Sequence, residues 1–325
     1  VGADGRAAIR AEHGSGLPPD VEEVVCDMPE VTIQQAYAVA LQHQNAGRLQ
    51  EAEGIYRQIV AADPRQVEAL HELGLLAHRC GRHEVAADLL RRVIALNPAY
   101  PHVHYNLGVM LRALGRLDEA IAAYRQAVAV NPSLAVAHNN LGSAYKDQGQ
   151  FDEAIAAYEQ AIAAAPGYAE AYNNLGNALR DKGRWKEAVA AFQRAIALKP
   201  GFSEAYCNLG VTLRDGEQLD EAIAAYRQAI ALNRHLPEAH RNLGAALADT
   251  GRVDEALGVY RQALAIRPDY AAAHGDLVYA MTFSPGYGSV QILAEAREWN
   301  RRHAEPLRPL IQPHGNERSP GRRLE

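Results

Sequence analysis

Residues 135–168 read AVAHNNLGSAYKDQGQFDEAIAAYEQAIAAAPGY, and versions of this stretch recur along most of the chain. The dipeptide Leu141-Gly142 returns at 73–74, 107–108, 175–176, 209–210 and 243–244, a constant step of 34 residues. A proline closes the copies in one register, at positions 64, 98, 132, 166, 200 and 268, and only Arg234 interrupts that series. A fixed period of this length predicts a repeat architecture.

Each copy contains two helical patterns. In the first half of the copy, His138, Leu141, Gly142 and Tyr145 fall at i, i+3, i+4 and i+7, which is one face of a helix. Gly149 follows where that helix should end, because glycine tolerates positive φ. Two acidic residues open a second stripe over 152–161, where the helix dipole favours them, and Pro166 ends the copy. The copy therefore predicts a helix hairpin.

Small residues lie where the two helices of a hairpin should touch, and large residues should fill the space around them. In the quoted copy these are Gly142 and Ala154, with Tyr145 and Tyr158 beside them. One hairpin cannot bury its apolar face alone, but stacked copies can. We therefore predict an all-α fold, a right-handed superhelical solenoid of antiparallel helix pairs with a concave inner surface.

The combination of Leu-Gly, a central Gly, Ala, Tyr or Phe, and Pro at these offsets resembles tetratricopeptide repeats, from about Ile33 into the 280s. The resemblance implies a protein-binding module. We expect a mobile segment at 1–30 and, at 31–281, a superhelix of seven repeats plus the first helix of an eighth. A capping helix should follow at 282–305, and 306–325 should be a linker toward a further domain.

Two places depart from the repeat pattern. In the sixth copy Glu217 stands where the turn glycine should be, and we expect the neighbouring Gly216 to take its role. After the first helix of the eighth copy, the sequence breaks at residues 284–288 and the second half of the copy is missing. Ser289 is then a candidate N-cap for a further helix that ends near His303.

The composition narrows the class of function. The net charge of −6 argues against nucleic-acid binding, which normally needs a basic face. No apolar run approaches the ~18 residues of a membrane span. The three cysteines are far apart and odd in number, which indicates free thiols in a reducing, cytoplasmic compartment. The sequence shows no nucleophile–base set, phosphate-binding loop or metal motif, so we predict no catalytic, cofactor or metal residue in this chain.

The residue before Leu-Gly is asparagine in five consecutive copies. A carboxamide offers a donor and an acceptor, so a ladder of them along the concave wall could hold the backbone of an extended peptide. The alternative is that these side chains link neighbouring helices and brace the superhelix, and the two roles are compatible. The predicted peptide-binding ladder consists of Asn106, Asn140, Asn174, Asn208 and Asn242.

Three further rows of polar residues recur along the chain, each at its own position in the repeat. A basic row and an acidic row lie one residue apart, and they predict either ion pairs between repeats or steering of charged peptide side chains. Tyrosine replaces histidine in two copies of the third row, which argues against metal binding. The basic row is Arg112, Lys146, Arg180 and Arg214; the acidic row is Asp147, Asp181, Asp215 and Asp249; the third row is His104, His138, Tyr172, Tyr206, His240 and His274.

The segment from His274 to Pro309 carries a second resemblance. His274, Leu277, Pro285, Trp299 and the stretch 303–307 resemble the junction between repeats and catalytic region in O-linked N-acetylglucosamine transferases and SPINDLY-type proteins. That family has an asparagine ladder for acceptor polypeptides. The resemblance implies a nucleotide-sugar (UDP-sugar) donor and a catalytic region that these residues do not include, so no catalytic residue is carried over.

The resulting hypothesis is a module that binds extended polypeptides or protein substrates, as the N-terminal substrate-recognition part of such a glycosyltransferase. The chain itself should not transfer sugar. The first alternative is a stand-alone scaffold for protein assembly or self-association, a possible homo-oligomer, in which Trp299 packs onto the last repeat. The second is an RNA-binding helical array, which the acidic balance disfavours.

Overall fold

The computed structural model describes residues 31–100 and 102–310, and all regular structure in them is helical. The segment 1–30, expected to be mobile, and most of the expected linker lie outside the described residues. The chain divides into two compact units between Ala178 and Leu179, inside helix α10. Unit 1 and unit 2 are described separately below.

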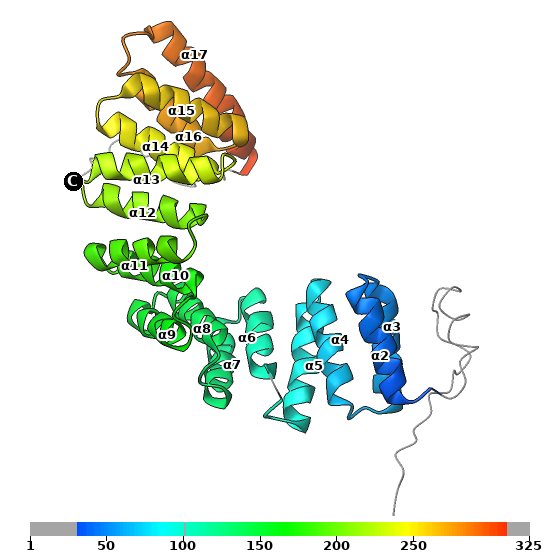
Figure 1. Cartoon of the computed structure of the whole chain (residues 1–325). Helices are drawn as coiled ribbons and strands as arrows, with labels where there is room; N and C mark the ends of the chain where they lie inside the picture. The colour runs from blue at the N-terminus through cyan, green and yellow to red at the C-terminus, as the bar shows by residue number, and fades with distance from the viewer. Residues whose placement is uncertain (1–30, 101, 311–325) are drawn as a thin grey trace, which may run out of the picture. The chain divides into compact units, whose positions relative to one another are not determined.

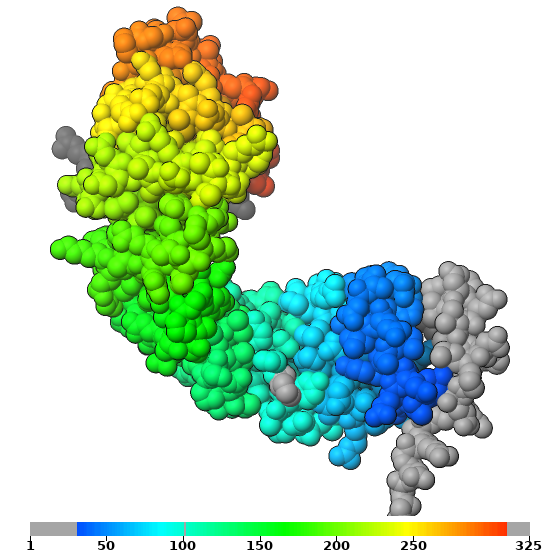
Figure 2. Space-filling model, viewed as in Figure 1, coloured from blue at the N-terminus to red at the C-terminus, as the bar shows by residue number. Residues whose placement is uncertain are grey.

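Unit 1 is a stack of helix hairpins (Figure 1). Its elements are α2 (Ile33–Asn45), α3 (Leu49–Ala62), α4 (Val67–Arg79), α5 (His83–Leu96), α6 (Val103–Ala113), α7 (Leu117–Val130), α8 (Ala135–Asp147), α9 (Phe151–Ala164) and the greater part of α10 (Ala169–Asp181). The helices α2 to α9 pack in consecutive pairs, and each pair packs on the next. On the face seen in Figure 2 this stack is continuous.

Unit 2 continues the same alternation of helices. It contains the end of α10, then α11 (Trp185–Leu198), α12 (Ser203–Asp215), α13 (Leu219–Leu232), α14 (Pro237–Asp249), α15 (Val253–Ile266), α16 (Ala271–Met281) and α17 (Ser289–Trp299), followed by a π-helical segment (Asn300–Ala304) and a 3₁₀ segment (Glu305–Leu310). The prediction of an all-α solenoid of helix pairs is therefore confirmed.

Close contact between glycine and tyrosine holds the two helices together in the third, fourth, sixth and seventh hairpins. A Cβ atom on Gly142 would lie 2.8 Å from the ring of Tyr158, and one on Gly210 would lie 2.6 Å from the ring of Tyr226. Both tyrosine rings are almost fully buried. Any side chain larger than hydrogen would displace these rings, which is why Leu-Gly recurs with the period of the repeat.

The turn inside each hairpin needs one residue with positive φ. Gly149 supplies it in the fourth repeat, at φ +75°. In the sixth repeat the expectation that Gly216 takes this role is wrong, because Gly216 has φ −90° and Glu217 itself has φ +61°. The N–H of Gln218 donates to the carbonyl of Leu213 across this turn, so the register of the helix end places Glu217 at the left-handed position.

The first helices of successive hairpins also touch one another within each unit. In unit 1, α4 contacts α6 and α6 contacts α8; in unit 2, α12 contacts α14 and α14 contacts α16. Close approach of the first helices is the arrangement in which they form the inner side of a solenoid. We call the exposed side of these first helices the inner face of each unit.

Helix α17 packs against α16 and so occupies the end of unit 2. Its N-cap is Gly288, whose N–H donates to the side chain of Gln291 at 2.8 Å, and Ser289 is the first helical residue. The expectation that Ser289 caps the helix is therefore wrong by one residue. The α-helix ends at Trp299, and the π segment carries the chain past His303.

Candidate functional site: the inner face of the first helices

The ladder asparagines are half-buried, and each described rung joins two successive repeats. The side-chain nitrogen donates to the residue 35 positions earlier, which is one position before the preceding ladder residue. The pairs are Asn106 with Nε2 of His71 (2.9 Å), Asn140 with the hydroxyl of Tyr105 (3.3 Å), Asn174 with Oδ1 of Asn139 (3.0 Å) and Asn242 with Sγ of Cys207 (3.8 Å). Asn208 holds the same position on α12 and also has a partner.

Both ends of the ladder carry a carboxylate in place of the carboxamide, and each end is satisfied differently. Asp276 accepts from Nε of Arg241 at 2.6 Å, so an ion pair replaces the last rung. Glu72 accepts from Gln44 at 2.9 Å and lies 3.2 Å from Nδ1 of His71. The hydrogen bond from His71 lowers the pKa of Glu72. Since Nε2 of His71 accepts from Asn106, its Nδ1 carries the proton.

These contacts show that the carboxamides brace neighbouring repeats. The bracing uses one N–H of each amide. The Oδ1 atoms of Asn106, Asn174 and Asn242 accept no hydrogen bond from the part of the chain that the structure describes. The same side chains are therefore held in one orientation and still present an acceptor, and their role in peptide binding stays a prediction.

The charged rows are paired in part. Arg112 donates to Asp147 at 2.8 and 2.9 Å, between successive repeats of unit 1. Arg180 approaches the adjacent Asp181 at 3.4 Å, and both Lys146 and Asp181 have further partners. No ion pair within 4 Å involves Arg214, Asp215 or Asp249 among residues 31–100 and 102–310. Exposed pairs of this kind each contribute up to about 1 kcal/mol.

Three histidines of the third row contact the turn that precedes their own helix. The Nε2 atoms of His104, His138 and His240 lie 2.9–3.1 Å from the carbonyl oxygen six residues earlier. This contact explains why the position accepts a planar polar ring. In the described ranges no group of three or more His, Cys, Asp or Glu side chains is arranged to hold a metal ion.

His274, in the same row, makes different contacts, which join α16 to α17 and to the π segment. Its Nδ1 lies 3.1 Å from Nε2 of His303, and its Nε2 lies 2.9 Å from Oε1 of Glu295. Nε1 of Trp299 donates to the carbonyl of Ala271 at 3.0 Å. Three residues of the glycosyltransferase resemblance, His274, Trp299 and His303, therefore meet where α17 and the π segment contact α16. Trp299 packs onto α16, the first helix of the eighth copy.

Two cysteines are described, and both are free thiols. Cys207 is buried, and burial raises the pKa of its thiol to about 11, so the group stays protonated and unreactive at neutral pH. Its contribution is the weak sulfur acceptor of the Asn242 rung. Cys80 is exposed at the end of α4, and Cys26 lies outside the described residues.

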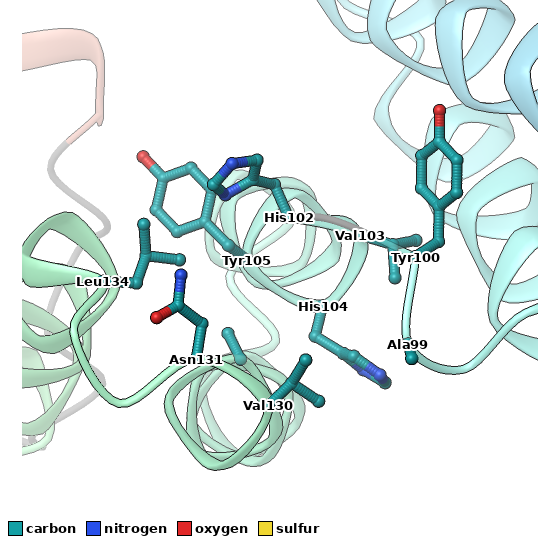
Figure 3. A pocket seen from close by; sticks show the side chains of 10 residues that line it. Ala99, Tyr100, His102, Val103, His104, Tyr105, Val130, Asn131 and Leu134 are labelled. Carbon is teal, nitrogen blue, oxygen red and sulfur yellow. The ribbon is translucent and has the colours of Figure 1, made fainter.

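A cavity of about 270 Å³ between the start of α6 and the end of α7 was not predicted. Figure 3 shows Tyr105, Asn131 and Leu134 on one side of it, and Tyr100 and His104 on the other. Helix α6 begins at Val103, two residues later in the repeat than α8 or α14, and His102 before it has φ +58°. The cavity lies beside this late start of α6, and no feature of the repeat pattern signalled it.

The lining of this cavity touches the ladder at one point. The ring of Tyr105 lines the space, and its hydroxyl accepts from Asn140. No lysine, arginine, aspartate or glutamate lines the cavity. The cavity could take a small apolar side chain next to that rung, but it offers no charged group for a phosphate or carboxylate.

Comparison with known proteins agrees with this fold. A model of the family described as cilia and flagella-associated protein 70 C-terminal domain matches residues 99–306, and a tetratricopeptide repeat model matches residues 37–101. No curated protein matches the sequence. No helix in the described ranges is long and apolar enough to cross a membrane.

Solved structures with this architecture are numerous. The C-terminal part of a tetratricopeptide repeat-containing protein from Cytophaga hutchinsonii is 17% identical, with a TM-score of 0.60 over 74% of this chain and 99% of that one. The APC/C hetero-tetramer Cut9–Hcn1 is 18% identical, with a TM-score of 0.56 over 82% and 52%. MamA is 31% identical over 50% and 95%, with a TM-score of 0.48. The first two support the fold alone.

Proposed function

Since the chain belongs to the family of tetratricopeptide domains described as cilia and flagella-associated protein 70 C-terminal domain, and is thus an interaction scaffold, we propose that it binds extended polypeptides on its inner faces. The observation that carries the proposal is the set of braced carboxamides at one repeat position. Bracing fixes their rotamers before a ligand arrives, which lowers the entropy that binding must overcome. The remaining acceptor of each amide can then bond a backbone N–H.

The proposal is tested by separating the carboxamide from its brace. Asn140→Ala removes both, whereas Tyr105→Phe removes only the hydroxyl that accepts from Asn140. The probe is a set of peptides selected from a randomised 12-residue library on the unmodified chain. We expect Asn140→Ala to weaken their binding about 2- to 12-fold, the value of one hydrogen bond. Tyr105→Phe should weaken binding less, because the carboxamide remains and only its fixed orientation is lost.

Asn174→Ala with Asn139→Ala is a second matched pair in the same unit, because Asn139 supplies the acceptor for that rung. Circular dichroism on each variant reports whether the helices persist. Equal binding by Asn140→Ala, Asn174→Ala and the unmodified chain would leave the ladder a brace alone and refute the peptide-binding role.

We further propose that the polypeptides held here are acceptors for a glycosyltransferase of the O-linked N-acetylglucosamine transferase type. The support is the resemblance of residues 274–309, together with the gathering of His274, Trp299 and His303 at the end of unit 2. The donor would be a UDP-sugar bound by a separate catalytic region. Reading the natural coding sequence past Glu325 tests this: a long α/β region that transfers sugar supports it, and a nearby stop codon refutes it.

One observation favours the stand-alone scaffold as the second candidate. The indole of Trp299 is hydrogen-bonded to α16, as expected for a terminal cap. Sedimentation of the chain over a range of concentrations tests self-association. A concentration-dependent oligomer that is lost in inner-face variants would favour the scaffold.

A further inference from the structure

The end of α16 carries the most exposed aromatic pair among residues 31–100 and 102–310. Tyr279 is 69% exposed and Phe283 is 60% exposed. The two rings meet edge to face, with their centroids 5.0 Å apart. Large aromatic groups side by side in water mark a contact surface, because burial of their apolar area is favourable.

This pair lies on the inner face of unit 2. Tyr279 follows Asp276 by three residues, which places both on one side of α16. Asp276 is bonded to Arg241, the neighbour of the ladder residue Asn242. At the position of Tyr279 the preceding first helices carry Ala245 and Val211, and at the position of Phe283 they carry Asp249 and Asp215. The aromatic pair is therefore peculiar to the last copy.

Three other aromatic rings in unit 2 are covered by a cation from the same chain. Lys199 lies 4.5 Å from the centroid of Phe202, Arg267 lies 4.7 Å from that of Tyr270, and Arg261 lies 5.6 Å from that of Tyr287. Within the described ranges no Lys or Arg lies over Tyr279 or Phe283. The most exposed rings of the unit thus lack such a partner.

The charge beside this pair favours a cation. Asp249 is the last residue of α14, where a carboxylate meets the negative end of the helix dipole, and it has no ion pair within 4 Å in the described part of the chain. Asp215 has the corresponding place on α12 and also lacks an ion pair in the described ranges, but the next first helix, α14, carries Ala245 and Asp249 where α16 carries Tyr279 and Phe283. Asp249 is therefore the carboxylate at the repeat position of Phe283 on the first helix adjacent to the aromatic pair.

We propose that Tyr279, Phe283 and Asp249 form a subsite for a lysine or arginine side chain of an extended polypeptide. The cation lies against the two rings, and the carboxylate of Asp249 and the C-terminal end of α14 supply the opposite charge. The inference rests on the proposed function, because it names the kind of side chain that the inner face of unit 2 selects.

The test uses three 12-residue peptides of glycine and serine, which carry arginine, leucine or glutamine at the same three positions. Binding to the whole chain is followed by calorimetry and by ring-proton NMR at millimolar peptide. We expect the arginine peptide to bind about fivefold more tightly than the leucine or glutamine peptide, and its affinity to fall as the salt concentration rises. Tyr279→Ala, Phe283→Ala and Asp249→Asn should each weaken it about two- to fivefold. Tyr287→Ala is the matched control, because Arg261 already covers that ring.

Equal binding of the leucine peptide, or an arginine preference that survives Tyr279→Ala and Phe283→Ala, would overturn the subsite. Absence of any ring-proton shift with the arginine peptide would do the same. The ladder test is independent of this result. If library-selected peptides lose affinity in Asn140→Ala but show no arginine preference, the proposed function holds and the cation subsite is wrong.

Discussion

The fourth and sixth repeats share one packing scheme and differ in how well their polar groups are satisfied. In both, a glycine of the first helix touches a buried tyrosine ring of the second. In the fourth repeat the hydroxyl of Tyr158 donates to Ser143 at 3.2 Å, whereas in the sixth the hydroxyl of Tyr226 is buried without a partner in the described structure. Val211 stands where Ser143 would, which accounts for the difference.

Two further differences point the same way. Gly149 occupies the left-handed turn position of the fourth repeat, while Glu217 is forced into it in the sixth. Asp147 is paired with Arg112, while the corresponding Asp215 has no ion pair in the described ranges. The apolar contact thus defines the repeat, and the local polar contacts set how stable each copy is. The sixth repeat should be the weaker of the two.

The shared contact gives the largest expected effect. Gly142→Ala and Gly210→Ala place a methyl group within 2.6–2.8 Å of a tyrosine ring, so each should destabilise its unit by about 1–3 kcal/mol through overpacking. Gly54→Ala is the control, because a Cβ there meets nothing within 4 Å, and it should stabilise α3 by up to about 1 kcal/mol. Urea unfolding measured by circular dichroism checks all three. A Gly210→Ala variant as stable as Gly54→Ala would contradict the packing account.

The turn residue gives the next effect. Glu217→Gly should stabilise unit 2 by about 1 kcal/mol, because an L-residue at positive φ costs about 1–2 kcal/mol and the more flexible glycine returns part of that gain to the unfolded chain. Gly149→Glu is the reciprocal change and should destabilise unit 1 by a similar amount. The midpoint of thermal unfolding is the measurement. Loss of stability in Glu217→Gly would show that the glutamate side chain makes a compensating contact.

The tyrosine hydroxyls distinguish the two repeats without altering the backbone. Tyr158→Phe removes a hydrogen bond and should cost about 0.5–1.5 kcal/mol. Tyr226→Phe removes a hydroxyl that has no partner in the described structure, so it should be neutral or slightly stabilising. Denaturant unfolding of the two variants in parallel gives the comparison. Equal losses in both would mean that the hydroxyl of Tyr226 has a partner such as an ordered water.

The sequence was a good guide wherever one interaction repeats. Leu-Gly, Ala, Tyr and Pro occur with a constant spacing, so they predicted the hairpins and placed the ladder on the first helices. It was a poor guide at single departures. Glycine preference alone favoured Gly216 for the turn, but packing of α12 and α13 fixes the register and forces Glu217 to positive φ. The late start of α6 and its cavity follow from local backbone geometry that the period does not encode.

The candidate site was predictable in position but not in its contacts. The ladder was expected from the spacing, yet the rung acceptors are His71, Tyr105, Asn139 and Cys207, four different side chains at one repeat position. No spacing rule identifies such a set, because each acceptor suits the amide for a different chemical reason. The exposed pair at the end of α16 was missed for a similar reason, since aromatic residues at helical spacing usually indicate a core.

The rung itself gives the smallest expected effect and the finest comparison of the two repeats. The rung of the fourth repeat is Asn174 to Asn139 at 3.0 Å, whereas Asn242 meets the sulfur of Cys207 at 3.8 Å. Cys207→Asn should convert the weak rung into the strong one and stabilise unit 2 by about 0.5 kcal/mol, the lower end for a net hydrogen bond, because burying a second amide offsets part of the gain. Urea midpoints report the change, and Cys207→Ala is the control that removes the sulfur and adds no acceptor. If Cys207→Asn is no more stable than Cys207→Ala, the rungs orient the ladder without stabilising it, and their value lies in pre-organising the inner face.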